Sequence, residues 1–511
     1  MSCLIILIVE ITNQADSFGR VETQSTKINN TSDYVIEYNY NSFPYFYDFV
    51  LNGLNETSEI SNISYSKKTG ETNTPILPTL RYEYYTDGNI HKVYENNIEK
   101  VRYYYDSFDQ LIRENNKYLN NGSGYTITYS YDDGGNMLEK KVYSYTTATN
   151  VTNLTPIDTI TYGYDSVWKD MMTSIDGEAI TRDAIGNPTS YPGVSNYIYW
   201  SEGNKIESIS WPEDSYWAYV AFLYNENGLR SEKNMYVAGV RAIKYFWIDN
   251  VLQSEYCEMD GYEIIYCYDA NGSLIGFTYE TSTSRTFYRY VMNLQGDVIA
   301  LLDESYNVVV KYTYDTWGKV LSVTDANGTL ITDTNHIGHR NPIRYRGYYY
   351  DIETGLYYLQ SRYYDPEAGS FVQSADVSTL TPSSINGVNL YNYANNNLIG
   401  NTGLAKEING TVLTSSQTIT LIPSHTVIIS DTGTVSDNCW NLHWENEWFD
   451  TDWPGILVVS NSTFELINWG LTGYKGSLFF DNNEQHSIYN GSLNISLYAG
   501  VNLKEKNMEQ K

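Results

Sequence analysis

The densest group of side chains that could do chemistry lies near the carboxyl end of the chain, in the stretch NCWNLHWENEWFDTDW. One histidine and four acids stand there among tryptophans: His443, Glu445, Glu447, Asp450 and Asp452, beside Trp440, Trp444, Trp448 and Trp453. Paired carboxylates could hydrolyse a glycosidic bond, and aromatic walls suit sugars. A metal site has little support, because His443 has no second histidine at ligand spacing. The alternative is a core of ordinary tryptophans with solvated acids, and we predict neither a metal nor a cofactor.

The four cysteines do not form a reactive or metal-binding group. No CxxC pair occurs among Cys3, Cys257, Cys267 and Cys439, so zinc and thioredoxin-type sites have no support. Cys257 and Cys267 flank an Asp260-Gly261 turn. A hairpin centred on that turn sets Cys257 opposite Ile264 and Cys267 opposite Ser254, which predicts that these two thiols do not form a disulfide. We expect all four to behave as small buried hydrophobic residues.

Composition places the chain among globular β proteins. Tyrosine contributes 52 of the 511 residues, hydrophobic residues make up 41% and charged ones 18%, so the chain resembles neither a charged disordered protein nor a membrane protein. Tyrosine favours strands and buries a large ring while its polar tip tolerates solvent. Glycine is plentiful and proline is scarce. These features predict an all-β fold with many short strands and turns.

Charge and hydropathy exclude two kinds of partner. The formal net charge of −29 repels nucleic acid and anionic membranes, and no basic patch interrupts it. The apolar run CLIILIV near the amino terminus is too short to span a bilayer. It also lacks the basic region and cleavage site of a signal peptide. We predict a strand there, no nucleic-acid partner and no membrane insertion.

The elements that carry these residues come from an internal repeat. Tyr-x-Tyr-Asp followed by glycine and an apolar residue recurs roughly every twenty residues. The copies are YEYYTDGNI from Tyr82, RYYYDSFDQLI from Arg102, TYSYDDGGNML from Thr128, TYGYDSVWKDM from Thr161, TRDAIGNPTS from Thr181, YIYWSEGNKI from Tyr197, FLYNENGLRSEK from Phe222, IYCYDANGSLIG from Ile265, RYVMNLQGDVIAL from Arg289 and KYTYDTWGKVL from Lys311. The aspartate can bond its own backbone two residues on, the glycine supplies positive φ, and alternation such as KVLSVTD returns as a partner strand. Each copy therefore predicts a β-hairpin, and stacked hairpins bury their tyrosine faces on one another.

Two segments that follow the repeats make the pattern specific. They are RYRGYYYDIETGLYYLQSRYYDPEAGSFVQSAD from Arg344 and INGVNLYNYANNN from Ile385. Together with the repeats they resemble the YD-repeat array and core of the RHS family, which bacterial polymorphic-toxin proteins and, more distantly, teneurins share. The resemblance covers residues 16 to 404. It implies a spiralling β-hairpin array over residues 1–340, a closing core at 341–404, and a variable β-rich domain at 405–511 in the position of a cargo.

The resemblance also implies a catalytic pair. RHS proteins cleave themselves at the end of the core with two aspartates, and by position these are Asp365 and Asp376, with the cut after Leu404. Two carboxylates held close cannot both ionise readily, so one can serve as acid while the other activates water. The sequence departs from the family pattern. Val377 stands where proline is common, one residue is inserted between the two acids, and Asn401 to Leu404 lacks the usual Asp-Pro. The alternative is that these acids are turn residues of a purely structural plug.

Taken together, the predicted function is a secreted or cell-surface bacterial container. A β shell would enclose or present its own carboxyl-terminal domain, and any catalysis would be limited to aspartyl self-cleavage. Because ADSFGRVETQST at 15–26 reads as a repeat without its tyrosine strand, we expect the chain to begin inside an array. The alternative is that this segment is a degenerate capping strand. An upstream array fragment or an immunity protein is then a further partner. The competing hypothesis is an adhesive repeat protein whose tail binds surface glycan or protein, and a third makes the tail an enzymatic toxin.

Overall fold

A computed structural model of the chain describes residues 9–15, 21–28, 33–42, 56–194, 197–212, 217–236, 240–269, 272–380 and 388–399, and after these only short strands between 410 and 488. The chain divides into two compact units. One comprises residues 1–14 and 22–404, and the other comprises residues 15–21 and 405–511. The finer boundaries predicted at 340 and 404 stay predictions.

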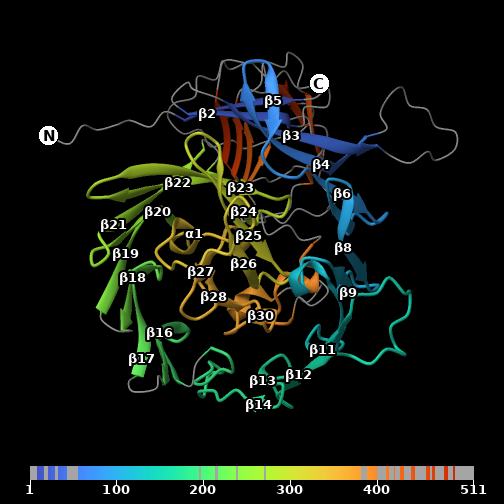
Figure 1. Cartoon of the computed structure of the whole chain (residues 1–511), viewed down its shortest axis with the longest axis vertical. Coiled ribbons are helices and arrows are strands. Elements are labelled where there is room, and N and C mark those ends of the chain that lie inside the picture. Colours follow the sequence, from blue (N-terminus) through green and yellow to red (C-terminus); the bar gives the residue numbers. More distant parts are fainter. Residues whose placement is uncertain are drawn as a thin grey trace, which may run out of the picture. The chain divides into compact units, whose positions relative to one another are not determined.

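Two large antiparallel sheets form most of the first unit (Figure 1). The 14-stranded sheet contains β1 Val9–Ala15, β2 Val21–Ile28, β3 Asp33–Ser42, β4 Glu56–Thr69, β5 Thr72–Pro75, β6 Leu80–Tyr84, β7 Ile90–Glu95, β8 Ile98–Tyr105, β9 Leu111–Asn116, β10 Tyr125–Tyr131, β11 Met137–Ser144, β12 Asp158–Tyr164, β13 Met172–Ile175 and β14 Glu178–Ala179. The 12-stranded sheet contains β15 Tyr197–Ser201, β16 Lys205–Pro212, β17 Trp217–Tyr224, β18 Arg230–Tyr236, β19 Val240–Ile248, β20 Val251–Cys257, β21 Tyr262–Tyr268, β22 Leu274–Thr281, β23 Arg285–Met292, β24 Val298–Leu302, β25 Val308–Tyr314 and β26 Val320–Thr324. Apart from β5, which lies off the path and pairs with β4, the strands follow chain order in both sheets, as successive hairpins require. The predicted all-β class is confirmed.

An aspartate, or in two repeats an asparagine, closes many of the hairpin turns. In the copy after β10, Asp132 Oδ1 accepts the backbone N–H groups of Gly134 and Asn136, each at 2.9 Å. Its Oδ2 accepts Asn136 Nδ2 at 2.8 Å, and Gly135 takes a φ of 76° that a residue with a Cβ rarely adopts. The same pattern recurs at Asp106, Asp183 and Asp303. One carboxylate thus satisfies the donors of a tight turn, which explains the aspartate in the repeat.

The tyrosine before that turn joins one hairpin to the previous one. Its hydroxyl donates to the backbone carbonyl of the apolar residue that opens the preceding return strand, over 2.6 to 2.9 Å. The pairs are Tyr105 with Ile90, Tyr131 with Leu111, Tyr164 with Met137, Tyr224 with Ile206, Tyr268 with Leu252 and Tyr314 with Val298. Neighbouring repeats are therefore connected by hydrogen bonds as well as by ring packing.

Replacing Tyr131 with phenylalanine should lower the free energy of unfolding by about 1 kcal/mol, because the buried Leu111 carbonyl loses its hydroxyl partner while the ring stays. Guanidinium unfolding of the full chain measures the loss. The control is Tyr199→Phe, since Tyr199 is 57% exposed and its change should stay within about 0.5 kcal/mol. Equal effects of the two variants would refute the role of the hydroxyl.

A short third sheet lies between the two large ones (Figure 1). It belongs to residues 341–399, here called the core segment, and contains β27 Tyr349–Asp351, β28 Leu356–Tyr358, β29 Tyr363–Asp365 and β30 Ser370–Phe371. Helical turns are few: α1 Ile337–Arg340 and the 3₁₀ turns η1 Asn120–Gly122, η2 Tyr345–Gly347, η3 Val377–Thr379 and η4 Ala394–Asn396. The tyrosine rings at 357 and 364 have no exposed surface, so the densest tyrosine segment forms the centre of the first unit.

The second unit contains parallel strands, which the sequence analysis did not predict. One four-stranded sheet is formed by β31 Gly410–Leu413, β33 Thr426–Ser430, β35 Ile456–Ser460 and β37 Ser477–Asp481, and the other by β32 Ile419–Thr420, β34 Cys439–His443, β36 Thr463–Leu466 and β38 Ser487–Ile488. All described pairs in them are parallel. Successive strands alternate between the two sheets, so the backbone follows the path of a repeating parallel coil.

The register predicted around Cys257 is wrong. Cys257 pairs with Tyr262, and Ile264 pairs with Glu255, because the turn takes only residues 258 to 261. The conclusion drawn from it is confirmed for these two thiols, since Cys257 and Cys267 are both free. All but the last residue of the predicted strand CLIILIV lies outside the described ranges. The last residue, Val9, begins β1.

Candidate functional site: the seam between the core segment and the sheets

Buried ion pairs join the core segment to the 12-stranded sheet. Arg230 and Lys233, both on β18, reach Asp351 on β27 at 2.6 and 3.1 Å, and Lys233 also lies 3.1 Å from Glu353. The side chains of Arg230 and Asp351 are each only 1% exposed. The Arg230 guanidinium also lies 3.9 Å from the ring centroid of Tyr358. A charged pair this deep holds two segments in one register, because neither partner can be left alone there.

A buried glutamate extends this contact. Glu255 on β20 is 1% exposed, and its carboxyl accepts the Tyr349 hydroxyl at 2.8 Å. Tyr349 in turn accepts the hydroxyl of Tyr245 at 3.1 Å. Burial raises the pKa of Glu255 to about 7. A cavity of about 480 Å³, lined by Lys233, Glu255, Tyr349 and Glu353 among others, adjoins this group.

An asparagine-rich strap joins the core segment to the 14-stranded sheet. Within residues 389–397, Asn389 Nδ2 bonds the Asn136 side chain at 2.8 Å, and Asn396 Nδ2 bonds Gln110 at 2.9 Å and the Gly135 carbonyl at 2.8 Å. Asn397 Nδ2 bonds Asn89 at 2.7 Å. The partners belong to three successive hairpin turns. The asparagine side chains of the strap therefore form hydrogen bonds with groups that the hairpin turns hold in place.

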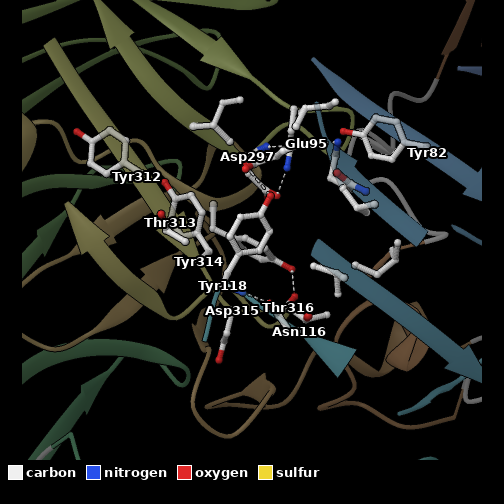
Figure 2. Close-up of a pocket in the computed structure, with 18 of the residues that line it drawn as sticks. Tyr82, Glu95, Asn116, Tyr118, Asp297, Tyr312, Thr313, Tyr314, Asp315 and Thr316 are labelled. Carbon is white, nitrogen blue, oxygen red and sulfur yellow. Dashed lines mark hydrogen bonds between the residues drawn. The ribbon is translucent and has the colours of Figure 1, made fainter. Parts of the chain in front are cut away.

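A tyrosine-lined cavity lies where the two large sheets face each other. Its volume is about 290 Å³, and it is lined by residues of β6 to β9 on one side and β24 to β25 on the other. Figure 2 shows Tyr312 and Tyr314 across from Tyr82, with Asp297 and Glu95 between them. The carboxylate of Glu95 accepts the Tyr118 hydroxyl at 2.8 Å. Asp315 also lines the cavity, and burial raises its pKa to about 6.

The two predicted catalytic aspartates have different surroundings. Asp365 is 4% exposed at the end of β29, its Oδ1 accepts the Glu367 N–H at 2.8 Å, and burial raises its pKa to about 6. Asp376 is exposed at the start of η3, where it accepts the Ser378 N–H at 2.8 Å, and hydrogen bonds from Ser378 lower its pKa. Both carboxylates close turns, as the structural alternative expected. Their pairing as a dyad stays a prediction.

Other predicted sites fall outside the described residues. Leu404 is one, and so are the side chains of His443, Glu445, Glu447, Asp450 and Asp452. Within the described part of the chain, no group of three or more His, Cys, Asp or Glu side chains is arranged to hold a metal ion. Over the same residues, the structure contains no helix with the length and apolar character needed to cross a bilayer.

Sequence reasoning missed the residues that form the seam. Arg230 and Lys233 stand in FLYNENGLRSEK, which reads as one more repeat, and their partners lie more than a hundred residues away. A usable signal existed in YYYDIET, where acids interrupt an otherwise apolar strand, since buried acids require cations. The strap had a signal as well, because NLYNYANNN supplies amides at closely spaced positions.

The fold and the seam define a class of protein: a β-hairpin array whose core segment packs between its sheets. The family model of the teneurin YD-shell matches residues 108–399, and the chain belongs to this family. The RHS and YD-repeat resemblance read from the sequence is thereby confirmed.

Curated relatives share this region. The chain is 31% identical over 300 residues to the tRNA3(Ser)-specific nuclease WapA of Bacillus spizizenii, covering 58% of this chain and 11% of that protein. It is 35% identical over 95 residues to double-stranded DNA deaminase toxin A of Burkholderia cenocepacia, covering 18% of this chain and 6% of the toxin. The chain thus spans a small part of the relatives it matches.

Among solved structures, the complex titled TcdB2-TccC3-Cdc42 matches with a TM-score of 0.55 and 17% identity, over 77% of this chain and 20% of that one. A related TcdB2-TccC3 structure without its hypervariable C-terminal region matches with a TM-score of 0.53 and 17% identity, over 77% and 20%. At such identities the likeness shows the fold alone.

Proposed function

We propose that residues 22–399 form a container that encloses or presents the domain following residue 404, for toxin delivery outside the producing bacterium. The observation that carries the proposal is the seam. The core segment is bound to both large sheets by buried polar contacts, through Asp351 on one side and Asn396 on the other. A segment bonded to both sheets in this way holds the array together at the point from which the chain continues toward residue 405.

The names of the relatives suggest the kind of cargo. Part of the chain is similar to a tRNA nuclease, and a shorter part is similar to a double-stranded DNA deaminase toxin. We infer that residues 405–511 occupy the cargo position and act on a competitor or host cell. Protease resistance tests the container: the tail should resist cleavage in the full chain and become sensitive when the seam is broken by Asp351→Asn. A tail equally sensitive in both chains would contradict enclosure.

Self-cleavage after Leu404 is the second part of the proposal. The raised pKa of Asp365 and the lowered pKa of Asp376 suit a proton donor and an ionised base. In the hydrolysis, Asp376 would accept a proton from the attacking water, and Asp365 would donate one to the leaving amide nitrogen. The products are a carboxylate on Leu404 and an amine on Ala405.

Intact mass of the purified full chain tests this step. The wild type should yield a fragment of residues 405–511, while Asp365→Asn and Asp376→Asn should each remain whole, because either carboxyl is needed for proton transfer. Asp249→Asn is the matched control, since Asp249 is exposed at a turn and should leave cleavage unchanged. An uncut wild type would contradict self-cleavage. The container proposal would be unaffected, because the protease experiment tests it separately.

The parallel strands of the second unit favour a second candidate function. Strands that alternate between two parallel sheets build repeating surfaces of the kind that repeat proteins use for binding. The chain would then be an adhesive surface protein whose tail binds glycan or protein. Glycan-array binding by the full chain, without harm to cells exposed to it, would favour this function over toxin delivery.

A further inference from the structure

The seam on the 12-stranded side contains more acids than cations. Arg230 and Lys233 face Asp351 and Glu353, which already balances two positive charges with two negative ones. Glu255 is the additional acid. Its carboxyl has Tyr349 as hydrogen-bond partner and no ion pair among the described residues. If Glu255 ionised, this group would hold three negative charges against two positive ones.

None of the remaining groups around Glu255 forms an ion pair with it among the described residues. The titratable side chains that its charge affects are tyrosines on the neighbouring elements: Tyr245, Tyr262, Tyr266, Tyr290 and Tyr349. Arg241, His339 and Arg340 line the same cavity, and the two arginines share one acid, Asp260, at 3.0 and 2.5 Å. They leave one positive charge over, but Arg241 is 43% exposed, so solvent screens its charge from Glu255. Cys257, two residues along β20, is uncharged and buried.

We propose that Glu255 and Tyr349 form a proton-operated latch, which holds the core segment on the 12-stranded sheet in mild acid and loosens as the pH rises to neutral. Protonated, Glu255 accepts the Tyr349 hydroxyl as a buried, uncharged acid. Ionised, it needs hydration. The adjoining cavity gives water a route to the carboxylate when β27 moves away from the sheet.

The direction follows from proton linkage. The closed form keeps the proton of Glu255 up to a pKa of about 7, whereas the opened form releases it near the ordinary value of about 4.3. Opening therefore releases a proton, so closure weakens as pH rises between these values and is constant above them. From pH 6 to pH 8 the closed-to-open ratio should fall about tenfold. The inference deepens the proposed function, because it gives the container a condition under which it opens.

Hydrogen exchange of the full chain measures this latch. The amide of Arg230 on β18, which donates to the Tyr358 hydroxyl of the core segment at 3.1 Å, reports opening once its rate is corrected for the intrinsic rate at each pH. Its protection should fall about tenfold from pH 6 to pH 8 in the wild type. Glu255→Gln should abolish that fall, and Glu226→Gln, at an exposed turn, should preserve it. Protection that is equal at the two pH values in the wild type would overturn the proposal.

A second variant guards against a misfolded Glu255→Gln chain. Tyr349→Phe removes the hydrogen bond that favours the ionised carboxyl, so the fall in protection should move to higher pH. A midpoint that stays in place would also count against the latch. Because the exchange readout requires neither cargo nor cleavage, it separates failure of the latch from failure of the container. An uncut chain with pH-dependent protection would keep the latch and reject self-cleavage.

Discussion

Replacing Asp351 with asparagine is expected to lower the free energy of unfolding by about 3–5 kcal/mol. The carboxylate of Asp351 balances Arg230 and Lys233 where all three side chains are at most 3% exposed. Asparagine keeps the shape but removes the charge. Two cations then face Glu353 alone, and neither can reach water without opening the seam. Removing one partner of a buried ion pair is strongly destabilising, because it leaves the other charge buried and unpaired. Replacing both partners with hydrophobic residues of similar volume costs much less.

Guanidinium unfolding of the full chain gives the size of this effect. Glu83→Gln is the control, because it breaks an ion pair with Lys92 at 2.6 Å in which Glu83 is 35% exposed, and pairs of that kind contribute at most about 1 kcal/mol. A chain carrying both Arg230→Met and Asp351→Leu should recover part of the loss, since no uncompensated charge then remains between them. If Asp351→Asn costs no more than Glu83→Gln, the buried pair does not hold the core segment.

The repeat units were predictable because their physics is local. The carboxylate of Asp132 and the amides it binds lie within four residues of each other, so the turn can be read from the letters alone. The hydrogen bond from the repeat tyrosine to the preceding hairpin is less local but still regular. Tyr131 reaches Leu111 across one hairpin, and the sequence analysis expected ring packing there rather than a hydroxyl bond to a carbonyl.

The seam could not be predicted because its partners are distant in sequence. Asn397 bonds Asn89 across more than three hundred residues, and no local pattern indicates which turn the strap will meet. The family resemblance singled out Asp365 as a candidate residue. The burial of its carboxyl could not be predicted, because it depends on segments that are distant in sequence. The error at Cys257 came from a turn of residues 258 to 261, where the prediction left residues 258 to 263 between the paired positions. A turn shorter than expected moves every pairing along the hairpin, which a strand pattern with period two cannot reveal.

Replacing Gly369, in the turn after Asp365, with alanine is expected to destabilise the chain strongly. Gly369 takes a φ of 68°, and a Cβ built there would lie 2.6 Å from Cε3 of Trp317. That ring is 2% exposed and packs against Tyr129 with ring centroids 5.6 Å apart, so it has little room to move. Gly369→Ala adds left-handed backbone strain of about 1–2 kcal/mol to overpacking of about 1–3 kcal/mol. We expect a total loss of about 2–5 kcal/mol in the free energy of unfolding.

Gly347 offers the matched control, because it takes nearly the same φ of 70° and a Cβ there would meet nothing within 4 Å. Gly347→Ala should therefore show the strain alone, and the difference between the two variants isolates the contact with Trp317. The same substitution bears on the chemistry. The Gly369 N–H donates to the Asp365 carbonyl at 2.9 Å, so a turn displaced by the new methyl group must move Asp365 as well. A Gly369→Ala chain that is as stable as Gly347→Ala and cleaves at the wild-type rate would show that neither the packing of this turn nor the position of Asp365 matters to the shell.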